Sequence, residues 1–447
     1  MKQGSEITID ITGVTNEGCG VGRCDGMAVF VENTVTGDRV KAKITKVGKS
    51  FLSAQPVKII TPSQYRIKEA CHRSSQCGGC AFWHIDYKAE CEIKRGFVRD
   101  AFARIAKLDV PVREVVFGKT SHYRNKAQYP IASDGKTGFY AKRSHNIIPC
   151  DNCLLQPEEF SKITKLVELF VKQYGISVYN EKTGKGLLRH LYVRTSASGD
   201  IMVVLVINGE NVPHSDALIN ILLSVFGDRL KSVMLNINRK NTNVVLGKEQ
   251  KILYGDGYIK DTICGVTLRV SPLSFSQVNH DMAERLYEKA ADYANPQGRT
   301  VIDLYCGTGA IGLSLAKRAK SVIGVEIVPE AIKDAEYNAK TNGIENARFI
   351  CADAAKAAEK LRDEGIKSDV VIVDPPRKGC DKEVLEIIAN NFCPKTLVYV
   401  SCDPATLARD CKVLSELGYI VEEATPVDLF PRTTHIETAA KLVRVNN

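Results

Sequence analysis

The sequence predicts an α/β protein in which a Rossmann-like domain follows a small OB-like β-barrel and a central α+β domain. A length of 447 residues exceeds what one hydrophobic core usually organises, so we expect several domains. Residues 300–343 alternate strand, glycine-rich turn, helix, strand and helix, which is typical of a nucleotide-binding fold. Short alternating segments fill the N-terminal region. We therefore divide the chain into residues 1–61, 62–275 and 276–447.

Composition narrows the class of protein. The hydrophobic fraction of 44% and the charged fraction of 25% are those of a globular protein. The N-terminus lacks the apolar region of a signal peptide, and no apolar stretch is long enough to span a membrane. We expect a cytoplasmic protein without membrane contact. Its 15 cysteines then favour metal binding over a disulfide framework.

The positive charge is concentrated near the N-terminus. Residues 62–145 hold 16 Lys and Arg against 8 Asp and Glu, whereas the 302 residues after the first 145 carry 37 against 38. No basic amphipathic membrane helix or lipidation motif accompanies this charge. A nucleic acid is therefore the expected partner.

Residues 1–61 contain the segments EITIDITGV, GMAVFVEN, DRVKAKITKV and FLSAQPVKII between Gly and Asn turns. This rhythm predicts a five-stranded barrel of OB-like type, whose basic face would bind oligonucleotides. The stretch GVGRCDGMAVFVENTVTGDRV resembles a TRAM domain, an RNA-binding module of RNA-modifying enzymes.

A cysteine cluster follows in CHRSSQCGGCAFWHIDY, where Cys71, Cys77 and Cys80 have the spacing C-x5-C-x2-C. The glycines between the last two let the chain fold tightly, so that their thiolates can point at one centre. A fourth thiolate must come from elsewhere, and Cys150 and Cys153 are the candidates. Spacing alone suits an iron–sulfur cluster and Zn²⁺ equally.

The region between these cysteines combines aromatic and basic residues. It contains an amphipathic basic helix, KRGFVRDAFARIAK, and the stretch HYRNKAQYPIASDGKTGFYAKRSHNIIPC. Aromatic rings that stack on bases, interleaved with cations for phosphates, are typical of single-stranded RNA binding. Residues 160–275 then predict an amphipathic helix and two strand pairs, without recognisable catalytic residues.

The glycine-rich turn DLYCGTGAIG lacks the third glycine of the dinucleotide fingerprint, which argues against NAD. Asp303 at a strand end and Glu326 twenty-three residues later fit a ligand with an ammonium group and ribose hydroxyls, which is S-adenosylmethionine. Together with Asp353 in CADAA and Asp374 in DVVIVDPPRKG, this pattern predicts a methyltransferase.

The segment TLVYVSCDPATLARD places Cys402 after an apolar strand and before a helix. A methyltransferase needs a cysteine when the target is carbon, because C5 of a pyrimidine becomes nucleophilic only after a thiolate adds to C6. A base must then remove the C5 proton. Glu437 is our candidate for that base, and His435 is the weaker alternative.

The motifs SFSQVN, DLYCGTGAIG, GVE, VDPPRKG, VSCDPATLARD and HIET together resemble the RNA uridine C5-methyltransferases, in the branch that carries a TRAM domain and an iron–sulfur cluster. The resemblance implies Cys402 as nucleophile and Glu437 as proton acceptor. It implies cofactor or base contacts at Gln277, Tyr305, Glu326, Asp353 and Asp374. Ala310 replaces an Asn that some relatives use near the cofactor.

The same resemblance implies a [4Fe-4S] cluster held by Cys71, Cys77, Cys80 and Cys153. The tRNA enzyme of this family resembles only the later part of the chain and lacks both barrel and cluster, so we expect large-subunit (23S) rRNA as substrate. We also expect no DNA partner and a monomer. The alternatives are tRNA uridine, RNA cytosine C5, or an inactive RNA-binding assembly factor. RNA cytosine enzymes usually carry a second cysteine after the motif proline, where this chain has Pro376 and Arg377.

Overall fold

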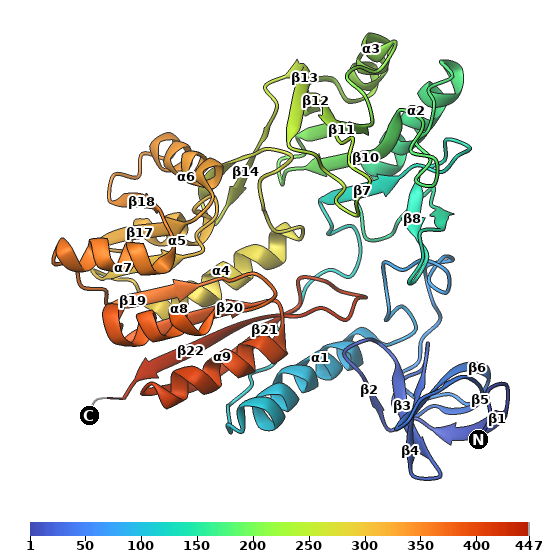
Figure 1. Cartoon of the computed structure of the whole chain (residues 1–447), viewed down its shortest axis with the longest axis horizontal. Helices are drawn as coiled ribbons and strands as arrows, with labels where there is room; N and C mark the ends of the chain where they lie inside the picture. Colours follow the sequence, from blue (N-terminus) through green and yellow to red (C-terminus); the bar gives the residue numbers. More distant parts are fainter. Residues whose placement is uncertain (446–447) are drawn as a thin grey trace.

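A computed structural model describes residues 1–445, and the N-terminal strands form one six-stranded sheet in the order β1-β5-β6-β4-β3-β2 (Figure 1). The sequence predicted five strands, and the sixth is the two-residue strand β2, in which Gly13 and Val14 pair with Val21 and Gly20. The sheet encloses a core of its own, which contains Val29, among other residues. Its strands are β1 (Glu6–Asp10), β2 (Gly13–Val14), β3 (Gly20–Cys24), β4 (Met27–Val31), β5 (Arg39–Val47) and β6 (Phe51–Thr61).

The central part is built on a five-stranded sheet in the order β13-β12-β11-β10-β7. Strands β10 and β11 are buried along their whole length, and the amphipathic helix expected near residue 160 is α2. The elements are β7 (Lys126–Pro130), β8 (Gly138–Tyr140), β9 (Ile147–Pro149), α2 (Glu158–Gln173), β10 (Leu188–Thr195), β11 (Ile201–Ile207), α3 (Ser215–Phe226), the 3-10 turn η2 (Gly227–Arg229), β12 (Leu230–Ile237) and β13 (Glu249–Gly255).

The C-terminal part contains a seven-stranded sheet in the order β18-β17-β16-β19-β20-β22-β21. Its first five strands in that order are parallel, as the alternating sequence predicts, and β22 inserts antiparallel between β20 and β21. The strands are β16 (Thr300–Leu304), β17 (Ser321–Glu326), β18 (Ala347–Cys351), β19 (Val370–Val373), β20 (Thr396–Ser401), β21 (Tyr419–Val427) and β22 (Glu437–Arg444).

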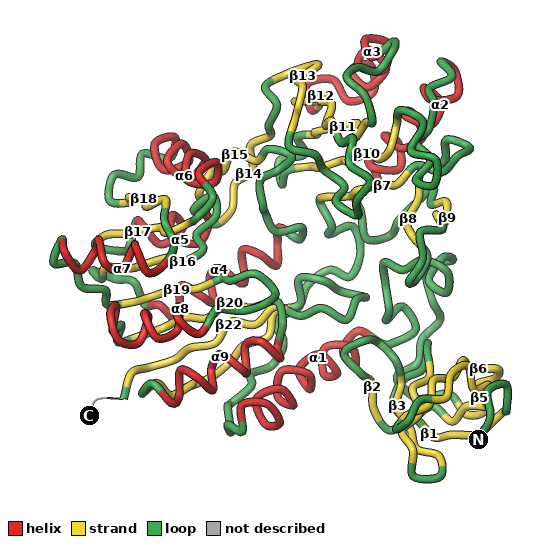
Figure 2. The backbone as a smooth tube through the Cα atoms, in the orientation of Figure 1, coloured by secondary structure: helices red, strands yellow, loops and turns green. Residues whose placement is uncertain are grey.

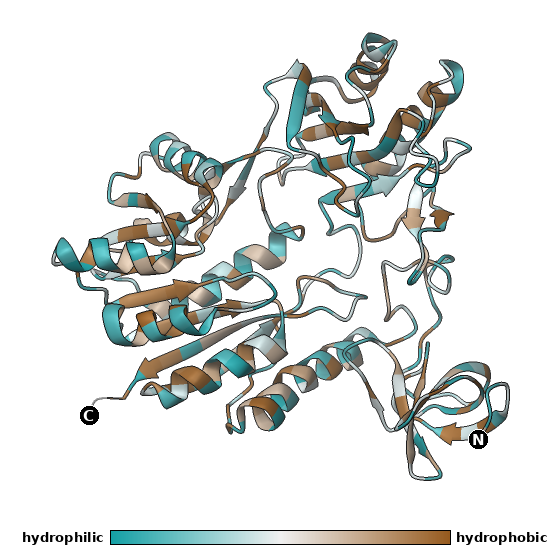
Figure 3. Cartoon of the chain, in the orientation of Figure 1, coloured by the Kyte–Doolittle hydropathy of each residue, from teal (hydrophilic) through white to brown (hydrophobic). Residues whose placement is uncertain are grey.

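Helices cover both faces of this sheet, so its central strands are continuous apolar runs. In β20, Leu397 and Tyr399 belong to one core, whereas Val398 and Val400 belong to the other. Figure 3 shows the resulting concentration of hydrophobic residues in the strands. The helical elements are α4 (His280–Ala294), α5 (Ala310–Ala316), α6 (Pro329–Thr341), α7 (Ala354–Asp363), α8 (Lys382–Ile387), the π-helical turn η3 (Ile388–Phe392) and α9 (Pro404–Glu416), and the hairpin β14 (Ile259–Ile263) and β15 (Val266–Val270) packs beside α5 and α6.

The predicted basic helix is α1 (Tyr87–Ala101), continued by the π-helical turn η1 (Phe102–Ala106). It lies against α9 of the C-terminal part, as Figure 2 shows. Val98 and Phe102 are buried in the same core as the strands of the seven-stranded sheet. The helix therefore joins the cysteine-rich segment to the C-terminal part.

The order of the seven strands confirms the predicted Rossmann-like α/β class. The predicted third part, residues 276–447, includes residues 446–447, which lie outside the described residues. Within residues 1–445, none of the helices is long and apolar enough to cross a membrane.

Candidate active site

Cys402 lies at the carboxyl edge of the seven-stranded sheet, directly after β20, where α/β sheets bind their ligands. The next residue, Asp403, caps α9: its carboxylate accepts hydrogen bonds from the N–H groups of Ala405 at 2.8 Å and Thr406 at 3.1 Å. Pro404 begins the helix with a ring suited to its first turn. This strand-to-helix turn fixes the backbone of Cys402 and leaves its thiol partly exposed.

Glu437 reaches the same edge from the opposite chain direction, because it begins the antiparallel strand β22. Ser401 is the last residue of β20 in register with β22, opposite Thr438. Continuing that register by one residue sets Cys402 opposite Glu437. A carboxyl group and a thiol from positions thirty-five residues apart in the sequence thus line one cavity.

Electrostatics distinguish this pair from ordinary surface groups. Burial raises the pKa of Glu437 to about 8, with a further contribution from Asp374 and an opposing one from the Arg377 guanidinium. Burial likewise raises the pKa of the Cys402 thiol to about 11, again opposed by Arg377. Perturbed groups of this kind in one cavity are characteristic of catalytic sites.

The glycine-rich turn after β16 brings backbone to the cavity wall in conformations that side chains disfavour. Tyr305, Gly307 and Gly309 all have positive φ, of 64°, 54° and 83°. The Glu326 carboxylate is held in place by backbone: it accepts hydrogen bonds from Gly307 N–H at 3.2 Å and from Ile327 N–H at 2.8 Å. This arrangement fixes the orientation of the Glu326 carboxylate at the cavity wall.

Asp303 supplies a second observation that fits S-adenosylmethionine. One carboxyl oxygen accepts a hydrogen bond from Gly312 N–H at 2.9 Å, whereas the other is buried without a partner. An ammonium group would satisfy that oxygen. The surrounding cavity of about 780 Å³ is lined by Asp303 and by all seven predicted catalytic and cofactor residues, namely Gln277, Tyr305, Glu326, Asp353, Asp374, Cys402 and Glu437.

Asp353 and His435 occupy less specialised positions in this cavity. The Asp353 carboxylate caps α7 by accepting a hydrogen bond from Lys356 N–H at 2.9 Å, so it also has a structural role. His435 is exposed, although burial of its ring lowers its pKa. His435 is therefore less buried than Glu437, and its pKa is lowered whereas that of Glu437 is raised.

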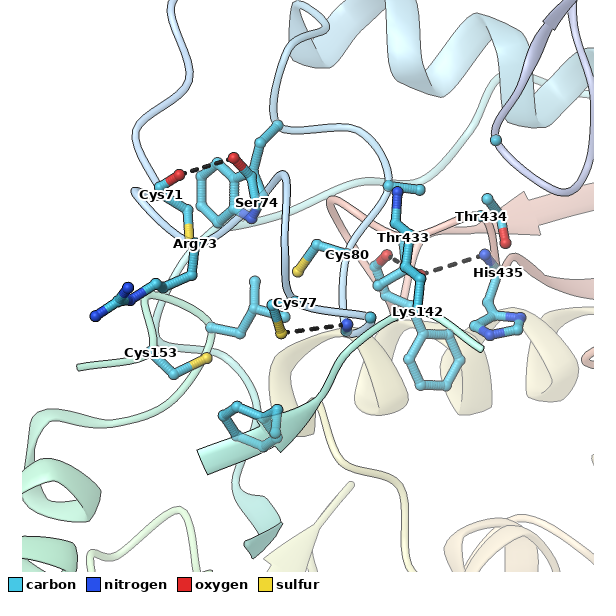
Figure 4. A pocket seen from close by; sticks show the side chains of 18 of the residues that line it. Cys71, Arg73, Ser74, Cys77, Cys80, Lys142, Cys153, Thr433, Thr434 and His435 are labelled. Carbon is cyan, nitrogen blue, oxygen red and sulfur yellow. Dashed lines mark hydrogen bonds between the residues drawn. The ribbon is translucent and has the colours of Figure 1, made fainter. Parts of the chain in front are cut away.

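A second cavity, of about 620 Å³, contains all the predicted metal ligands, Cys71, Cys77, Cys80 and Cys153, together with Cys150. Figure 4 shows the four predicted ligands around one space, with His435 at its edge. The Cys77 sulfur accepts a hydrogen bond from Gly79 N–H at 3.4 Å. Such N–H donors are typical of thiolates that hold iron–sulfur clusters.

The donor types in this cavity suit a thiolate-bound metal group, but the thiols are not gathered into a ligand set. Within residues 1–445, no three His, Cys, Asp or Glu side chains lie close enough together to hold a metal ion. The structure leaves the [4Fe-4S] cluster, the zinc alternative and the choice between Cys150 and Cys153 as predictions.

The residues that line both cavities were not predicted from the sequence as a group. Arg124, Lys126, Arg377, Phe430 and His435 line both. Apart from His435, none was singled out as a site residue. The only sequence signal was the mixture of aromatic and basic residues around HYRNKAQ, which names no individual residue.

Comparison with known proteins gives two family matches. Residues 86–445 match the family described as tRNA (uracil-5-)-methyltransferase, and residues 1–57 match the TRAM domain. The TRAM match confirms the barrel and its expected RNA-binding character. The two matches together span nearly the whole chain.

Similar proteins cover the chain from end to end. An uncharacterized RNA methyltransferase of Clostridium acetobutylicum is 45% identical and covers 100% of this chain and 98% of its own length. Another, from Caldanaerobacter subterraneus subsp. tengcongensis, is 44% identical, with coverages of 100% and 99%.

Among solved structures, the Pyrococcus abyssi tRNA (uracil-54, C5)-methyltransferase in complex with S-adenosyl-L-homocysteine has a TM-score of 0.79 and 27% identity. It matches over 98% of this chain and 100% of that one. An enzyme named for tRNA therefore aligns with the N-terminal part as well. The presence of the N-terminal barrel therefore does not by itself separate rRNA enzymes from tRNA enzymes.

Proposed function

The chain belongs to the tRNA (uracil-5-)-methyltransferase family, and from this premise we propose that it methylates C5 of uridine in large-subunit rRNA through a covalent bond between Cys402 and C6. That it is an S-adenosylmethionine-dependent RNA uracil-5-methyltransferase follows from family membership. The covalent step, the individual residue roles and the rRNA substrate are our proposal. The observation that carries it is that Cys402, directly after β20, and Glu437, at the start of the neighbouring strand β22, line the same cavity.

In the proposed reaction, the Cys402 thiolate adds to C6 of uracil, and the displaced electron pair makes C5 nucleophilic. C5 takes the methyl group that S-adenosylmethionine supplies. The Glu437 carboxylate then accepts the C5 proton, the C5–C6 double bond re-forms, and the carbon–sulfur bond breaks to release the thiolate. The products are 5-methyluridine, S-adenosylhomocysteine and a protonated Glu437.

The electrostatics of the cavity support these roles. Glu437 must be ionised to accept the proton, which the Arg377 guanidinium favours, and a pKa of about 8 then makes its carboxylate a stronger base than an ordinary one. The thiol of Cys402 needs nearby positive charge to ionise. Arg377 supplies one such charge, and the cationic sulfonium of the cofactor would supply another.

Two RNA classes remain candidate substrates. The predicted cysteine ligand set supports large-subunit rRNA, because it belongs to the iron–sulfur branch that the sequence resembles. The structural similarity to a tRNA (uracil-54, C5)-methyltransferase makes tRNA the second candidate. RNA recognition itself is supported by the TRAM domain.

We also propose that Cys71, Cys77, Cys80 and Cys153 hold a [4Fe-4S] cluster, because these four thiols line one cavity. The cluster would fix the loop-rich segment around them and takes no part in methyl transfer. Cys402 lines the other cavity, so the two proposed thiol functions are spatially separate.

The decisive experiment maps 5-methyluridine at nucleotide resolution in total RNA from cells with the gene, without it, and without it but expressing Cys402→Ala. We expect one or two marks in 23S rRNA to disappear with the gene and to return with the wild-type protein alone. Cys24→Ala is the matched control, because Cys24 lies in the barrel and lines neither cavity.

The same experiment separates the alternatives. Loss of 5-methyluridine from a tRNA would show that tRNA is the substrate and leave the proposed chemistry unchanged. Loss of 5-methylcytidine would show that the methylated base is cytosine and not uracil. Full restoration by Cys402→Ala would contradict the covalent mechanism. Unchanged RNA in every strain would indicate an RNA-binding factor instead of an active enzyme.

A further inference from the structure

The cofactor cavity and the cysteine cavity meet along one shared wall. Five residues line both: Arg124, Lys126, Arg377, Phe430 and His435. They come from three distant segments, namely the start of β7, the loop after β19, and the loop between β21 and β22. We call these five residues the shared wall.

The three cations of the shared wall have no protein partner. Within residues 1–445, the side chains of Arg124, Lys126 and Arg377 make neither an ion pair nor a hydrogen bond. Burial, together with the charges of Arg194 and Arg124, lowers the pKa of Lys126 to about 8. An anion would relieve the repulsion between Arg124 and Lys126, and phosphate is the anion that RNA brings.

The other two members of the shared wall are aromatic. The rings of Phe430 and His435 lie with centroids 5.9 Å apart at an interplanar angle of 76°. Aromatic rings beside cations form the usual binding surface for an unpaired nucleotide, with the base stacked and the phosphate neutralised. The shared wall therefore combines aromatic rings that can stack on the base of a nucleotide with cations that can bind its phosphate.

The cysteine cavity has room on the far side of this wall. Its volume of about 620 Å³, which includes the space proposed above for the cluster, is within the range of ordinary ligand sites, roughly 300–1,000 Å³. Its acidic lining, Glu17 and Glu32, comes from the N-terminal barrel, and Glu17 pairs with Arg143 at 3.5 Å. Because these carboxylates repel a phosphate, we place the phosphate at the shared wall.

We propose that the shared wall binds the RNA nucleotide adjacent to the target uridine, with its phosphate against Arg124 and Lys126 and its base beside Phe430 on the cysteine side. This inference rests on the proposed function, because it takes the uridine to occupy the cofactor cavity beside Cys402. It adds a requirement on the substrate: the target and one neighbour must both be unpaired and unstacked from each other.

A first test measures binding to a single-stranded oligouridine of about 12 nucleotides as a function of salt. Each phosphate contact with a single strand contributes about −0.7 to the slope of log K against log salt. We expect Lys126→Met to reduce the slope by about 0.7, and Lys126→Met with Arg124→Gln by about 1.4. Lys231→Met is the control, since Lys231 is exposed on β12 and lines neither cavity.

A second test uses the RNA segment around the mapped uridine, with one neighbouring phosphate replaced by a neutral methylphosphonate. At one of the two linkages, the wild-type protein should lose about tenfold in affinity, whereas Lys126→Met should lose little more. An abasic neighbour should cost the wild type roughly 5- to 150-fold, and Phe430→Leu should make that change nearly neutral.

The inference would be overturned by two results together. The salt slope would be unchanged in both Lys126 variants, and the methylphosphonate would reduce the affinity of the wild type and of Lys126→Met equally at both linkages. The proposed function is scored separately, by whether the wild-type protein forms 5-methyluridine in the unmodified segment. If it forms none in any RNA, the oligouridine measurement still decides whether the wall binds RNA.

Discussion

At the scale of single residues, the cofactor cavity contains three acids that favour their protonated form. Burial raises the pKa of Glu437 to about 8, and burial raises the pKa values of Asp303 and Asp374 to about 7. Between its ordinary pKa and its raised one, a folded acid binds more protons than the unfolded chain. The contribution of Glu437 to stability is therefore highest below about pH 4.5 and falls as the pH rises to about 8, and that of the two aspartates falls between about pH 3.8 and about pH 7.

This predicts a pH-dependent effect of Glu437→Gln, which keeps the shape of the side chain and cannot ionise. At about pH 8 the variant should melt about 2 °C or more above the wild type, because it avoids a buried charge. Near pH 5 the two should melt together. Thermal unfolding across this pH range is the measurement. Glu416→Gln on exposed α9 is the control, and a pH-independent difference would contradict the assignment of the shift to Glu437.

At the scale of elements, the loop between β21 and β22 is held by α1 through buried charges. The Lys94 ammonium lies 2.8 Å from the carboxylates of both Glu90 and Asp428. Glu90 also accepts a hydrogen bond from Arg432 N–H at 2.7 Å. Arg432 in turn accepts a hydrogen bond at its carbonyl from Phe82 N–H at 3.1 Å. The loop that leads to β22 is thus attached to the cysteine-rich segment.

Lys94→Met should destabilise the protein by about 3–5 kcal/mol, because it leaves buried carboxylates without their cation. Adding Asp428→Asn should recover part of that loss, since Arg432 still pairs with Glu90 at 3.2 Å. Lys88→Met on the exposed side of α1 is the control. Denaturant unfolding measures all three variants. Equal stability of Lys94→Met and Lys88→Met would show that the network does not hold the loop.

At the scale of the whole molecule, the cysteine cavity lies where all three parts of the chain meet. Glu17 comes from the barrel, Cys80 from the central part, and Phe430 from the C-terminal part. A metal group bound there would connect the RNA-binding barrel to the catalytic domain. Its loss should therefore weaken RNA binding more than it alters cofactor binding.

We predict that the full chain purified without oxygen contains iron and sulfide and is brown. Cys80→Ser should lose the iron and bind RNA more weakly, while Cys24→Ser keeps both properties. Elemental analysis and salt-dependent RNA binding are the measurements. One equivalent of zinc in place of iron would show that the site is tetrahedral zinc instead.

The sequence by itself determined the features that depend on local order along the chain. Apolar runs ending in chemically reactive residues predicted β20 with Cys402, and the glycine-rich turn predicted the cofactor edge with Glu326. Their positions at one edge of the sheet agree with the structure because parallel strands place their carboxyl ends together. Family resemblance supplied the proposed role of Glu437, which local pattern alone left as one of two candidates.

Only the tertiary structure decided which distant segments meet. The antiparallel insertion of β22 sets Glu437 opposite Cys402, yet nothing in its sequence distinguishes it from a parallel strand. Glu90 and Lys94, four residues apart on a helix, have the pattern of a surface ion pair but are fully buried. The shared wall combines three segments in the same way. Such contacts depend on long-range packing, which local sequence patterns do not encode.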